Sequence, residues 1–349
     1  GVNSHAIVAV KDREIGVDDV RRVIERARAV AVPEGPSSMD VVHVVPQQFV
    51  VDDQMGVRSP VGMNGCRLEA HAHIVTAGRT AVQNIRRACE AAGVNVAEIA
   101  LQQFASAEAV LTPDERDMGV AVIDIGGGTT DLAVFVKGAV VYTKVLELGG
   151  NHLTTDIASG LRTPKDEAER LKHKYGCALT TLVAPDEEMD VPSVGGRPPR
   201  KRARQVLSEI VEARMEEILC LARRDLEAAG LLEHLHSGLV LTGGSTLVSG
   251  LTELAEDIFE LDVRAGAPRG VGGLTNVISS PKYATGVGLV LQSAAAIRAD
   301  VGEVSGDFLG TPLGAGVTSD PSTTGRHAAM RSSQPSALSR WKSWLSELF

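Results

Sequence analysis

The sequence predicts an α/β protein of more than one domain, and three observations support this prediction. Two apolar runs, residues 120–123 and 132–136, flank a glycine-rich turn and are typical of buried strands. A third strand-like run, 239–241, leads through Gly243 and Gly244 into a helical pattern. Helical and strand-like patterns also alternate elsewhere, and a chain of 349 residues can form two or more cores.

The composition narrows the class of protein. Hydrophobic residues make up 44% and charged residues 23%, as in ordinary globular proteins. The formal net charge of −9 argues against general affinity for nucleic acid. The four cysteines form no CxxC pair, so reduced thiols are favoured over disulfides or zinc ligands; they are Cys66, Cys89, Cys177 and Cys220. No apolar run is long enough to span a bilayer.

The turn between the first two apolar runs has the composition of a phosphate site. It reads Asp124-Ile125-Gly126-Gly127-Gly128-Thr129-Thr130-Asp131. Three glycines let the backbone approach a bulky anion, and their N–H groups can form a concave nest for phosphate. The two threonines add hydroxyl donors, and Asp124 can hold a hydrated cation against the phosphate. The alternative is an ordinary glycine-rich hairpin turn.

Residues 1–76 have the pattern of a small α/β unit. Strands are expected at 6–10, at 41–45 and 49–51 on either side of Pro46, and at 68–75. A helix is expected at 18–30, with Asp18 as its N-cap.

Two histidines in the last of these strands raise the question of a metal site. His71 and His73 are two residues apart and therefore share a face of the strand. Because no third ligand is evident, a solvent-facing strand with polar side chains is the favoured interpretation.

The chain between this unit and the glycine-rich turn contains both kinds of pattern. Residues 77–92 place Val82, Ile85, Ala88 and Cys89 on one helical stripe. A strand is expected at 96–104 and a helix at 105–111, and residues 113–118 form a polar break.

Three later features each permit a purely structural and a functional interpretation. Gly149-Gly150-Asn151 opens a helix, either as a simple turn or as a second anion contact at a helix N-terminus. Glu169 and Lys172 lie on one face of a short helix, most simply as a surface ion pair. The basic run within 191–204 is expected to be a solvated loop rather than a nucleic-acid patch, because no aromatic residues interrupt it. A long amphipathic helix, 205–229, follows.

The amino-acid composition changes twice near the end of the chain. Residues 300–335 are rich in Gly, Ser, Thr, Pro and Asp and are predicted to be a disordered linker. Residues 336–349 form an amphipathic pattern about 21 Å long as a helix, with both tryptophans of the chain. Its apolar residues are Leu338, Trp341, Trp344, Leu345, Leu348 and Phe349. Such a helix suits a membrane interface, and docking into a partner's groove is the alternative.

The glycine-rich turn excludes two common nucleotide folds. No GK[ST] follows the glycines, which excludes a P-loop, and a strand rather than a helix follows them, which excludes a Rossmann fingerprint. A phosphate hairpin combined with a distant Gly-Gly turn indicates the actin/Hsp70/hexokinase superfamily.

Several stretches resemble the FtsA family of bacterial actin-like cell-division proteins. They are HVVPQQF at 43–49, FASAEAVL at 104–111, DIGGGTTD at 124–131, VPSVGGRPPR at 191–200, LTGG at 241–244 and the terminal Trp-containing helix. The resemblance extends over the chain apart from the linker. VPSVGGRPPR and the terminal helix are far more specific than the glycine motifs, which the superfamily shares.

The resemblance implies an actin-like fold of two lobes with ATP and Mg²⁺ between them. Residues 1–76 would be the inserted subdomain called 1C, and 77–118 the remainder of the first lobe. The second lobe would comprise the phosphate-hairpin part 119–151, an outer subdomain 152–237 and the adenosine part 238–283. A connecting helix 284–299, the linker 300–335 and the membrane helix 336–349 would follow.

The resemblance also implies the site residues. Asp124, Gly126, Gly127, Gly128, Thr129 and Thr130 would form the second phosphate loop, with Asp124 reaching Mg²⁺ through water. Gly243, Gly244 and Ser245 would form the adenosine turn. Glu169 and Lys172 would contact ribose and adenine. Gln102 would stand where relatives place a water-orienting residue, and any ATP hydrolysis would be slow.

The family's role implies the partners and the location. Its members tether filaments of the tubulin-like protein FtsZ to the inner membrane at the division septum, self-assemble, and contact later division proteins. The terminal helix would bind lipid, and residues 152–237 would receive the FtsZ tail. The competing hypotheses are a small-molecule kinase of the same superfamily and an actin-like scaffold of pilus assembly.

One departure from the family pattern concerns the phosphate clamp. Actin-like proteins use two phosphate hairpins, but the sequence holds a single Asp-x-Gly-type hairpin of this kind. We therefore expect that several tens of residues carrying the first hairpin have been lost before Gly1, and that this chain binds ATP weakly or not at all. Tight Mg²⁺-dependent binding in calorimetry would contradict that expectation.

Overall fold

A computed structural model of the chain describes residues 1–32, 38–273 and 275–300. The chain divides into two compact units, 1–314 and 315–349, and the second lies wholly outside the described residues. The predicted linker, from residue 301 onward, and the predicted membrane helix 336–349 therefore lie outside them too. Among the residues described, no helix combines the length and apolarity needed to cross a membrane.

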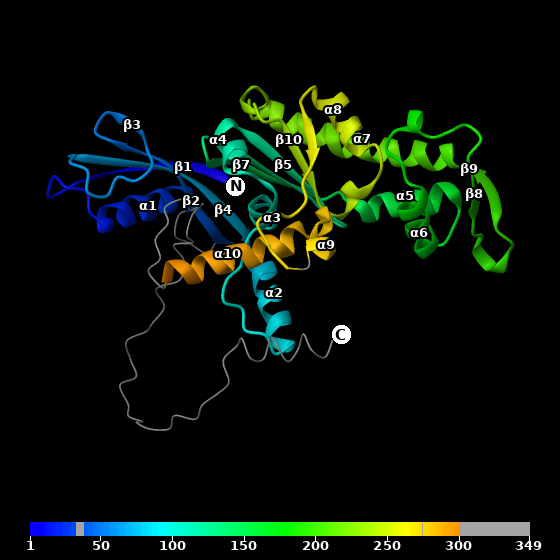
Figure 1. The fold of residues 1–349 in the computed structure, drawn as a ribbon. Coiled ribbons are helices and arrows are strands. Elements are labelled where there is room, and N and C mark those ends of the chain that lie inside the picture. The colour runs from blue at the N-terminus through cyan, green and yellow to red at the C-terminus, as the bar shows by residue number, and fades with distance from the viewer. Residues whose placement is uncertain (33–37, 274, 301–349) are drawn as a thin grey trace. The chain divides into compact units, whose positions relative to one another are not determined.

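The described residues up to Gly78 form a four-stranded antiparallel sheet with one helix packed on it, at the left of Figure 1. The strand order is β1-β4-β2-β3. Its elements are β1 (Val2–Ala9), α1 (Val17–Ala31), β2 (Met39–Val51), β3 (Gln54–Val57) and β4 (Arg67–Gly78). Val23, Ile24 and Ala27 of α1 are buried against Leu68 and Ala70 of β4, so alternate strand residues form one core. We call this part the inserted sheet.

The structure corrects two sequence predictions in the inserted sheet. Residues 39–51 form one strand through Pro46, because β-bulges beside Val41 and Pro46 absorb the irregularity. The N-cap of α1 is Gly16 rather than Asp18, and its N–H donates to Asp19 Oδ2 at 3.1 Å.

The second sheet has five strands in the order β11-β10-β5-β6-β7. Its strands are β5 (Val120–Ile125), β6 (Thr130–Val136), β7 (Ala139–Leu146), β10 (Leu239–Thr242) and β11 (Val263–Ala265). β5, β6 and β7 pair antiparallel, whereas β10 runs parallel to β5 and β11. The carboxyl ends of β5 and β10 therefore meet at one edge, which is where ligands bind in such sheets.

Helices cover both faces of this sheet. Ile123 and Ile125 point into a core shared with α5 (Gly150–Leu161), α7 (Arg204–Ala228) and α8 (Leu251–Phe259). Val120 and Val122 point the other way, into a core shared with α3 (Gln102–Val110) and α10 (Ala284–Asp300). Layers of this kind, with α6 (Lys165–Tyr175) packed beside α5, confirm the predicted α/β class.

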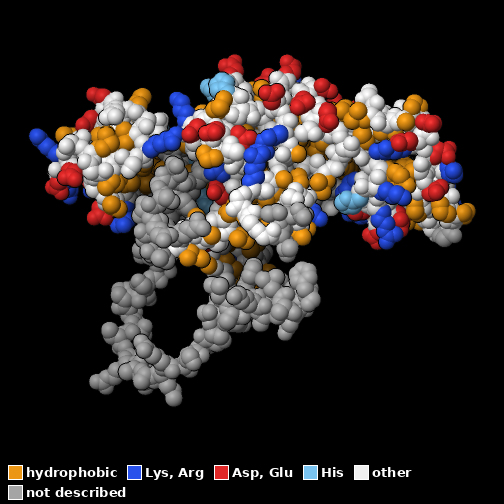
Figure 2. Space-filling view, in the orientation of Figure 1, with side chains coloured by type: hydrophobic (Ala, Val, Ile, Leu, Met, Phe, Trp, Pro, Cys, Tyr) orange, Lys and Arg blue, Asp and Glu red, His pale blue; other side chains and the backbone are white. Residues whose placement is uncertain are grey.

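A two-stranded hairpin stands beyond α6, at the right of Figure 1. It comprises β8 (Glu188–Val191) and β9 (Arg200–Ala203), so the basic run enters a strand instead of remaining a loop. Two cations of the run form ion pairs: Lys201 of β9 lies 3.3 Å from Glu188, and Arg204, which follows β9, lies 2.6 Å from Glu187. Basic and acidic side chains are interspersed there in Figure 2.

The remaining elements are short segments and α2. The short ones are α4 (Pro113–Met118), α9 (Thr275–Ile278) and the 3₁₀ turns Thr180–Leu182, Val194–Gly196, Leu232–His234, Gly244–Leu247 and Pro281–Tyr283. α2 (Arg79–Ala91) has the predicted apolar stripe, but none of its residues is buried and Ile85 is 53% exposed.

Two predictions before the second sheet are wrong. Residues 96–101 form no strand, and 102–110 are helical throughout. Residues 113–118 are a helix because Thr112 and Glu115 form a capping box and Pro113 occupies the first turn.

Polar side chains join the inserted sheet to the second sheet. Gln47 Nε2 donates to Val140 O at 2.8 Å, and His73 Nε2 lies 2.9 Å from Thr143 Oγ1. His73 is only 2% exposed, so the prediction of a solvent-facing strand is wrong for it. No group of three His, Cys, Asp or Glu side chains among the described residues could hold a metal ion.

His43 of β2 accepts a hydrogen bond from the Leu101 N–H, and its imidazole predicts that the stability of the protein depends on pH. Burial lowers the pKa of its imidazole from 6.5 to about 4. Between these values the unfolded chain binds a proton that the folded protein excludes, so the free energy of unfolding falls as the pH falls. The free energy of unfolding, measured by urea denaturation, is expected to fall less between about pH 8 and about pH 5 in His43→Gln than in the unaltered protein. The difference should be on the order of 2 kcal/mol. His5→Gln, at an exposed histidine, is the control. Equal losses for the His43 variant and the unaltered protein would contradict a partly buried, neutral imidazole.

Candidate functional site

The glycine-rich turn joins β5 to β6, as predicted. Asp124 pairs with Asp131 and Ile125 with Thr130 in the antiparallel ladder. The Gly126 N–H donates to Thr129 O at 2.9 Å and closes the turn. Within the described part of the chain, the amides of Gly127 and Gly128 have no hydrogen-bond partner. They are therefore available to an anion.

Asp124 lies at the end of β5 and is only 1% exposed. Its Oδ2 accepts hydrogen bonds from Ser106 Oγ of α3 at 2.5 Å and from Thr285 Oγ1 of α10 at 3.3 Å. A carboxylate can accept more than these two hydrogen bonds, so Asp124 can still accept a contact from a ligand. Its oxygens are hard ligands suited to a hydrated Mg²⁺ ion.

The threonines of the turn are engaged within the protein. Thr129 Oγ1 donates to Asp131 Oδ2 at 2.8 Å, and the buried Thr130 donates to Leu148 O at 2.9 Å. Burial raises the pKa of Asp131 to about 6; the Thr129 hydroxyl opposes this shift and the neighbouring Asp124 adds to it. Thr130 thus secures the hairpin to the segment that follows β7, and its hydroxyl proton is used within the protein rather than for the predicted contact with a ligand.

The N-terminus of α5 supports the hairpin instead of offering free donors. The N–H groups of Gly150 and Asn151 donate to the carbonyls of Gly126 and Gly127, at 2.9 and 2.7 Å. Gly149 permits this approach, since a Cβ there would lie 2.8 Å from Gly126 O. The suggested second anion contact is therefore wrong for these two amides. Ser245 Oγ donates to Gly126 O at 3.0 Å and links the Gly-Gly turn to the same loop.

Glu169 and Lys172 form more than a surface pair. Lys172 is 9% exposed, and its Nζ lies 2.7 Å from Glu169 Oε2. The same ammonium donates to Gly150 O at 3.1 Å and to Thr154 Oγ1 at 2.9 Å. Burial works against ionisation of Glu169, but hydrogen bonds from Lys172 and Thr154 hold the pKa of that carboxyl below its usual value. The pair thereby ties α6 to the start of α5.

A cavity of about 350 Å³ lies between these elements. It brings together five predicted residues: Gly127, Glu169, Lys172, Gly244 and Ser245. Asp124 and Gly243 are not among its lining residues, but they lie close together, since a Cβ on Gly243 would be 2.4 Å from Asp124 Oδ1.

The cavity also has lining residues that the sequence did not predict. They include His173, Gly176, Leu247, Val248 and Lys282. His173 could have been found, because it follows Glu169 by four residues on the same helical face and lies 3.0 Å from it. Nothing in the sequence pattern distinguishes Lys282, whose Nζ lies 4.7 Å from the Tyr283 ring centroid.

Gln102, the first residue of α3, lies beside the hairpin. A Cβ built on Gly126 would be 3.7 Å from Gln102 Nε2. Ser106 follows one helical turn later, so both side chains project toward the β5–β6 loop.

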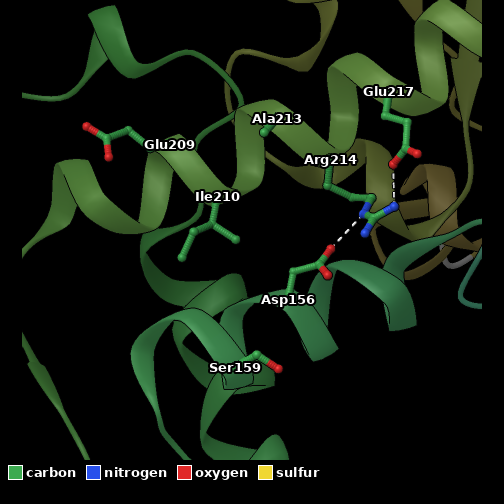
Figure 3. Close-up of a pocket in the computed structure, with 7 residues that line it drawn as sticks. All are labelled: Asp156, Ser159, Glu209, Ile210, Ala213, Arg214 and Glu217. Atoms are coloured by element: carbon green, nitrogen blue, oxygen red, sulfur yellow. Dashed lines mark hydrogen bonds and ion pairs between the residues drawn. The ribbon is translucent and has the colours of Figure 1, made fainter.

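A second cavity, of about 520 Å³, lies between α5 and α7 (Figure 3). Arg214 reaches from α7 to Asp156 of α5, with Nε 2.6 Å from Oδ2, and also pairs with Glu217. Ile210 and Ala213 add apolar surface beside these charges. The cavity therefore offers both charged and apolar contacts within residues 152–237.

Comparison with solved structures defines the class of protein. MreB5 of Spiroplasma citri bound to ADP matches with a TM-score of 0.51 and 21% identity, over 64% of this chain and 67% of that one. PilM in a PilM–PilN type IV pilus biogenesis complex matches with a TM-score of 0.55 and 18% identity, over 83% and 76%. The fold, with its phosphate-type hairpin, is that of an actin-like protein, as the sequence predicted.

Comparison with family models and curated relatives identifies the family. The cell division protein FtsA model matches residues 121–288, and the SHS2 domain inserted in FtsA matches 1–76. The type IV pilus assembly protein PilM model matches 60–178. Cell division protein FtsA of Pseudomonas aeruginosa is 47% identical over 290 residues, 83% of this chain and 69% of that protein. FtsA of Escherichia coli K12 is 41% identical over 295 residues, 82% and 70% respectively. The chain belongs to the FtsA family.

Proposed function

We propose that this protein is an ATP-binding, actin-like cell-division protein. The observation that carries the proposal is the β5–β6 hairpin, whose Gly127 and Gly128 amides have no partner among the described residues. This loop borders a cavity that Glu169, Lys172, Gly244 and Ser245 also line. Membership of the FtsA family supports the division role.

Each part of the proposed site has a distinct task. The hairpin amides would bind phosphate oxygens, and buried Asp124 would hold Mg²⁺ through water. The turn at Gly244 and the face of α6 bearing Glu169 would enclose the nucleoside. Lys172 would act mainly by fixing Glu169 and the start of α5, since its ammonium is already bonded to three groups.

Asp124→Asn is expected to weaken Mg²⁺-dependent ATP binding about tenfold, because an amide is a poorer partner for a hydrated cation than a carboxylate. Titration calorimetry with and without Mg²⁺, carried to about millimolar ATP, measures the change and also covers weak binding. Asp186→Asn is the control, since this aspartate is exposed and lies outside the cavity. Equal Mg²⁺ dependence in the Asp124 variant and the unaltered protein would argue against the assignment.

We further propose that the protein tethers FtsZ filaments to the inner membrane at the division septum. Residues 336–349 would bind lipid through their Trp, Leu and Phe side chains. The tail of FtsZ would bind the outer part, 152–237, and the cavity beside Arg214 has both charged and apolar contacts for a peptide. Self-assembly and contacts with later division proteins belong to the same proposal.

Removal of residues 336–349 is expected to abolish sedimentation with anionic vesicles, because this segment holds both tryptophans of the chain among apolar side chains at helical spacing. Added FtsZ should sediment with the full chain and vesicles but not with the shortened chain. A Trp341→Ala, Trp344→Ala variant serves as a full-length control and should show an intermediate loss. Equal sedimentation of all three forms would exclude the tether.

The match to PilM over residues 60–178 supports the pilus scaffold as a second candidate. It covers a shorter part of the chain than the two FtsA models together, and it leaves VPSVGGRPPR at 191–200 unexplained. Failure to recruit FtsZ, with vesicle binding intact, would favour it.

A further inference from the structure

The start of α3 is held by a side chain from the inserted sheet. Leu101 is the N-cap residue of α3 and cannot cap the helix with its apolar side chain. Its N–H instead donates to His43 Nε2 of β2 at 2.9 Å. An accepting Nε2 carries no proton, so the His43 ring is neutral with its proton on Nδ1.

His43 is directed at this helix by the shape of its strand. A β-bulge between Val41 and His43 shifts the register of β2 against β4. Bulges re-aim the side chains that follow them. The His43 ring also packs against Phe104 in the first turn of α3, with ring centroids 5.2 Å apart at 60°. The first turn therefore has two contacts with the same imidazole, one polar and one apolar.

The same turn carries the side chain that approaches the phosphate hairpin. Gln102 begins α3 and lies beside Gly126, and Ser106 donates to Asp124 four residues later. Farther along, α3 is fixed by close packing on Gly288 of α10. The position of Gln102 thus depends on the end of the helix that His43 holds.

We propose that His43 is a positioning residue, through which the inserted sheet sets Gln102 against the phosphate hairpin. The proposal rests on the proposed ATP-binding function. A displacement of the inserted sheet, for example by assembly with a second copy, would then alter the nucleotide site without touching it. Misplacement of a positioned group by about 1 Å can change a rate by up to about a hundredfold, so small shifts of α3 suffice.

Two substitutions separate the polar contact from the apolar one. His43→Gln can keep an acceptor near the position of Nε2 and lose the ring, whereas His43→Phe keeps a ring beside Phe104 and loses the acceptor. In amide hydrogen exchange without nucleotide, Leu101 should exchange about tenfold faster in His43→Phe than in the unaltered protein, and His43→Gln should restore most of the protection. Urea denaturation establishes that both variants are folded.

Steady-state ATP hydrolysis tests whether His43 affects the nucleotide site through Gln102. His43→Phe is expected to lower kcat about tenfold with KM nearly unchanged, and His43→Gln to remain within about twofold of the unaltered protein. In a Gln102→Ala background, His43→Phe should have little further effect, because both changes act on one group.

The outcomes are distinguishable. Equal behaviour of His43→Phe and His43→Gln, or additive effects with Gln102→Ala, would overturn the positioning role while leaving ATP binding intact. Absence of ATP turnover by the unaltered protein would overturn this role, whereas the proposed ATP binding is tested separately by calorimetry.

Discussion

Gly288→Ala is expected to lower the free energy of unfolding by about 3 kcal/mol, because α3 and α10 leave no space for a methyl group there. A Cβ on Gly288 would lie 1.7 Å from the carbonyl oxygen of Ala105 and 2.3 Å from its carbon. These are backbone atoms of a buried helix, so they cannot move aside as a flexible side chain could. The two helices would have to separate, and Asp124 would lose its fixed partners Ser106 and Thr285.

The same helix provides a matched control. Gly286 is exposed, and a Cβ there would meet no atom within 4 Å. Gly286→Ala should therefore stabilise the protein by up to about 1 kcal/mol through helix propensity. Urea denaturation of both variants measures the difference as opposite shifts of the midpoint. A midpoint for Gly288→Ala at or above that of the unaltered protein would refute close helix packing.

The parts of the site that follow from local sequence could be predicted. The hairpin of 124–131 lies between two apolar strands, and the turn at Gly243 and Gly244 lies between an apolar strand and a helix. Glycine at such turns lets the backbone approach a ligand closely, so both could be predicted. The resemblance to a known family then brought Glu169 and Lys172 to the same site, where the structure also places them. Periodicity alone could not have predicted that either residue lies at this site.

The parts that depend on distant contacts could not be predicted. The amides of Gly150 and Asn151 suggested an anion site, but the carbonyls of Gly126 and Gly127 occupy them. His73 alternates like a solvent-facing residue, yet the packing of β4 against β7 buries it. Residues 96–101 are apolar enough for a strand, but no sheet edge accepts them among the described residues. In each case tertiary contacts outweigh the local pattern.

Gly243→Ala is expected to have the largest effect on the nucleotide site itself. Gly243 ends β10 with φ +91, a conformation that a side chain rarely adopts. A Cβ there would lie 2.4 Å from Asp124 Oδ1 and 2.6 Å from the carbonyl oxygen of Ile125. Both the proposed Mg²⁺ carboxylate and the start of the phosphate hairpin would be displaced at once. We expect a loss of about 3 kcal/mol in unfolding free energy and the loss of measurable Mg²⁺–ATP binding in a titration carried to about millimolar ATP.

Gly244→Ala tests whether this effect is local to Gly243. A Cβ on Gly244 would approach nothing nearer than Lys282 Cβ at 3.8 Å, an ordinary contact, so the unfolding free energy should change by less than about 1 kcal/mol. Urea denaturation and calorimetric titration of Mg²⁺–ATP on both variants separate loss of fold from loss of site. If Gly243→Ala kept both its stability and its affinity, the end of β10 could not press on Asp124, and the proposed arrangement of carboxylate and hairpin would have to be abandoned.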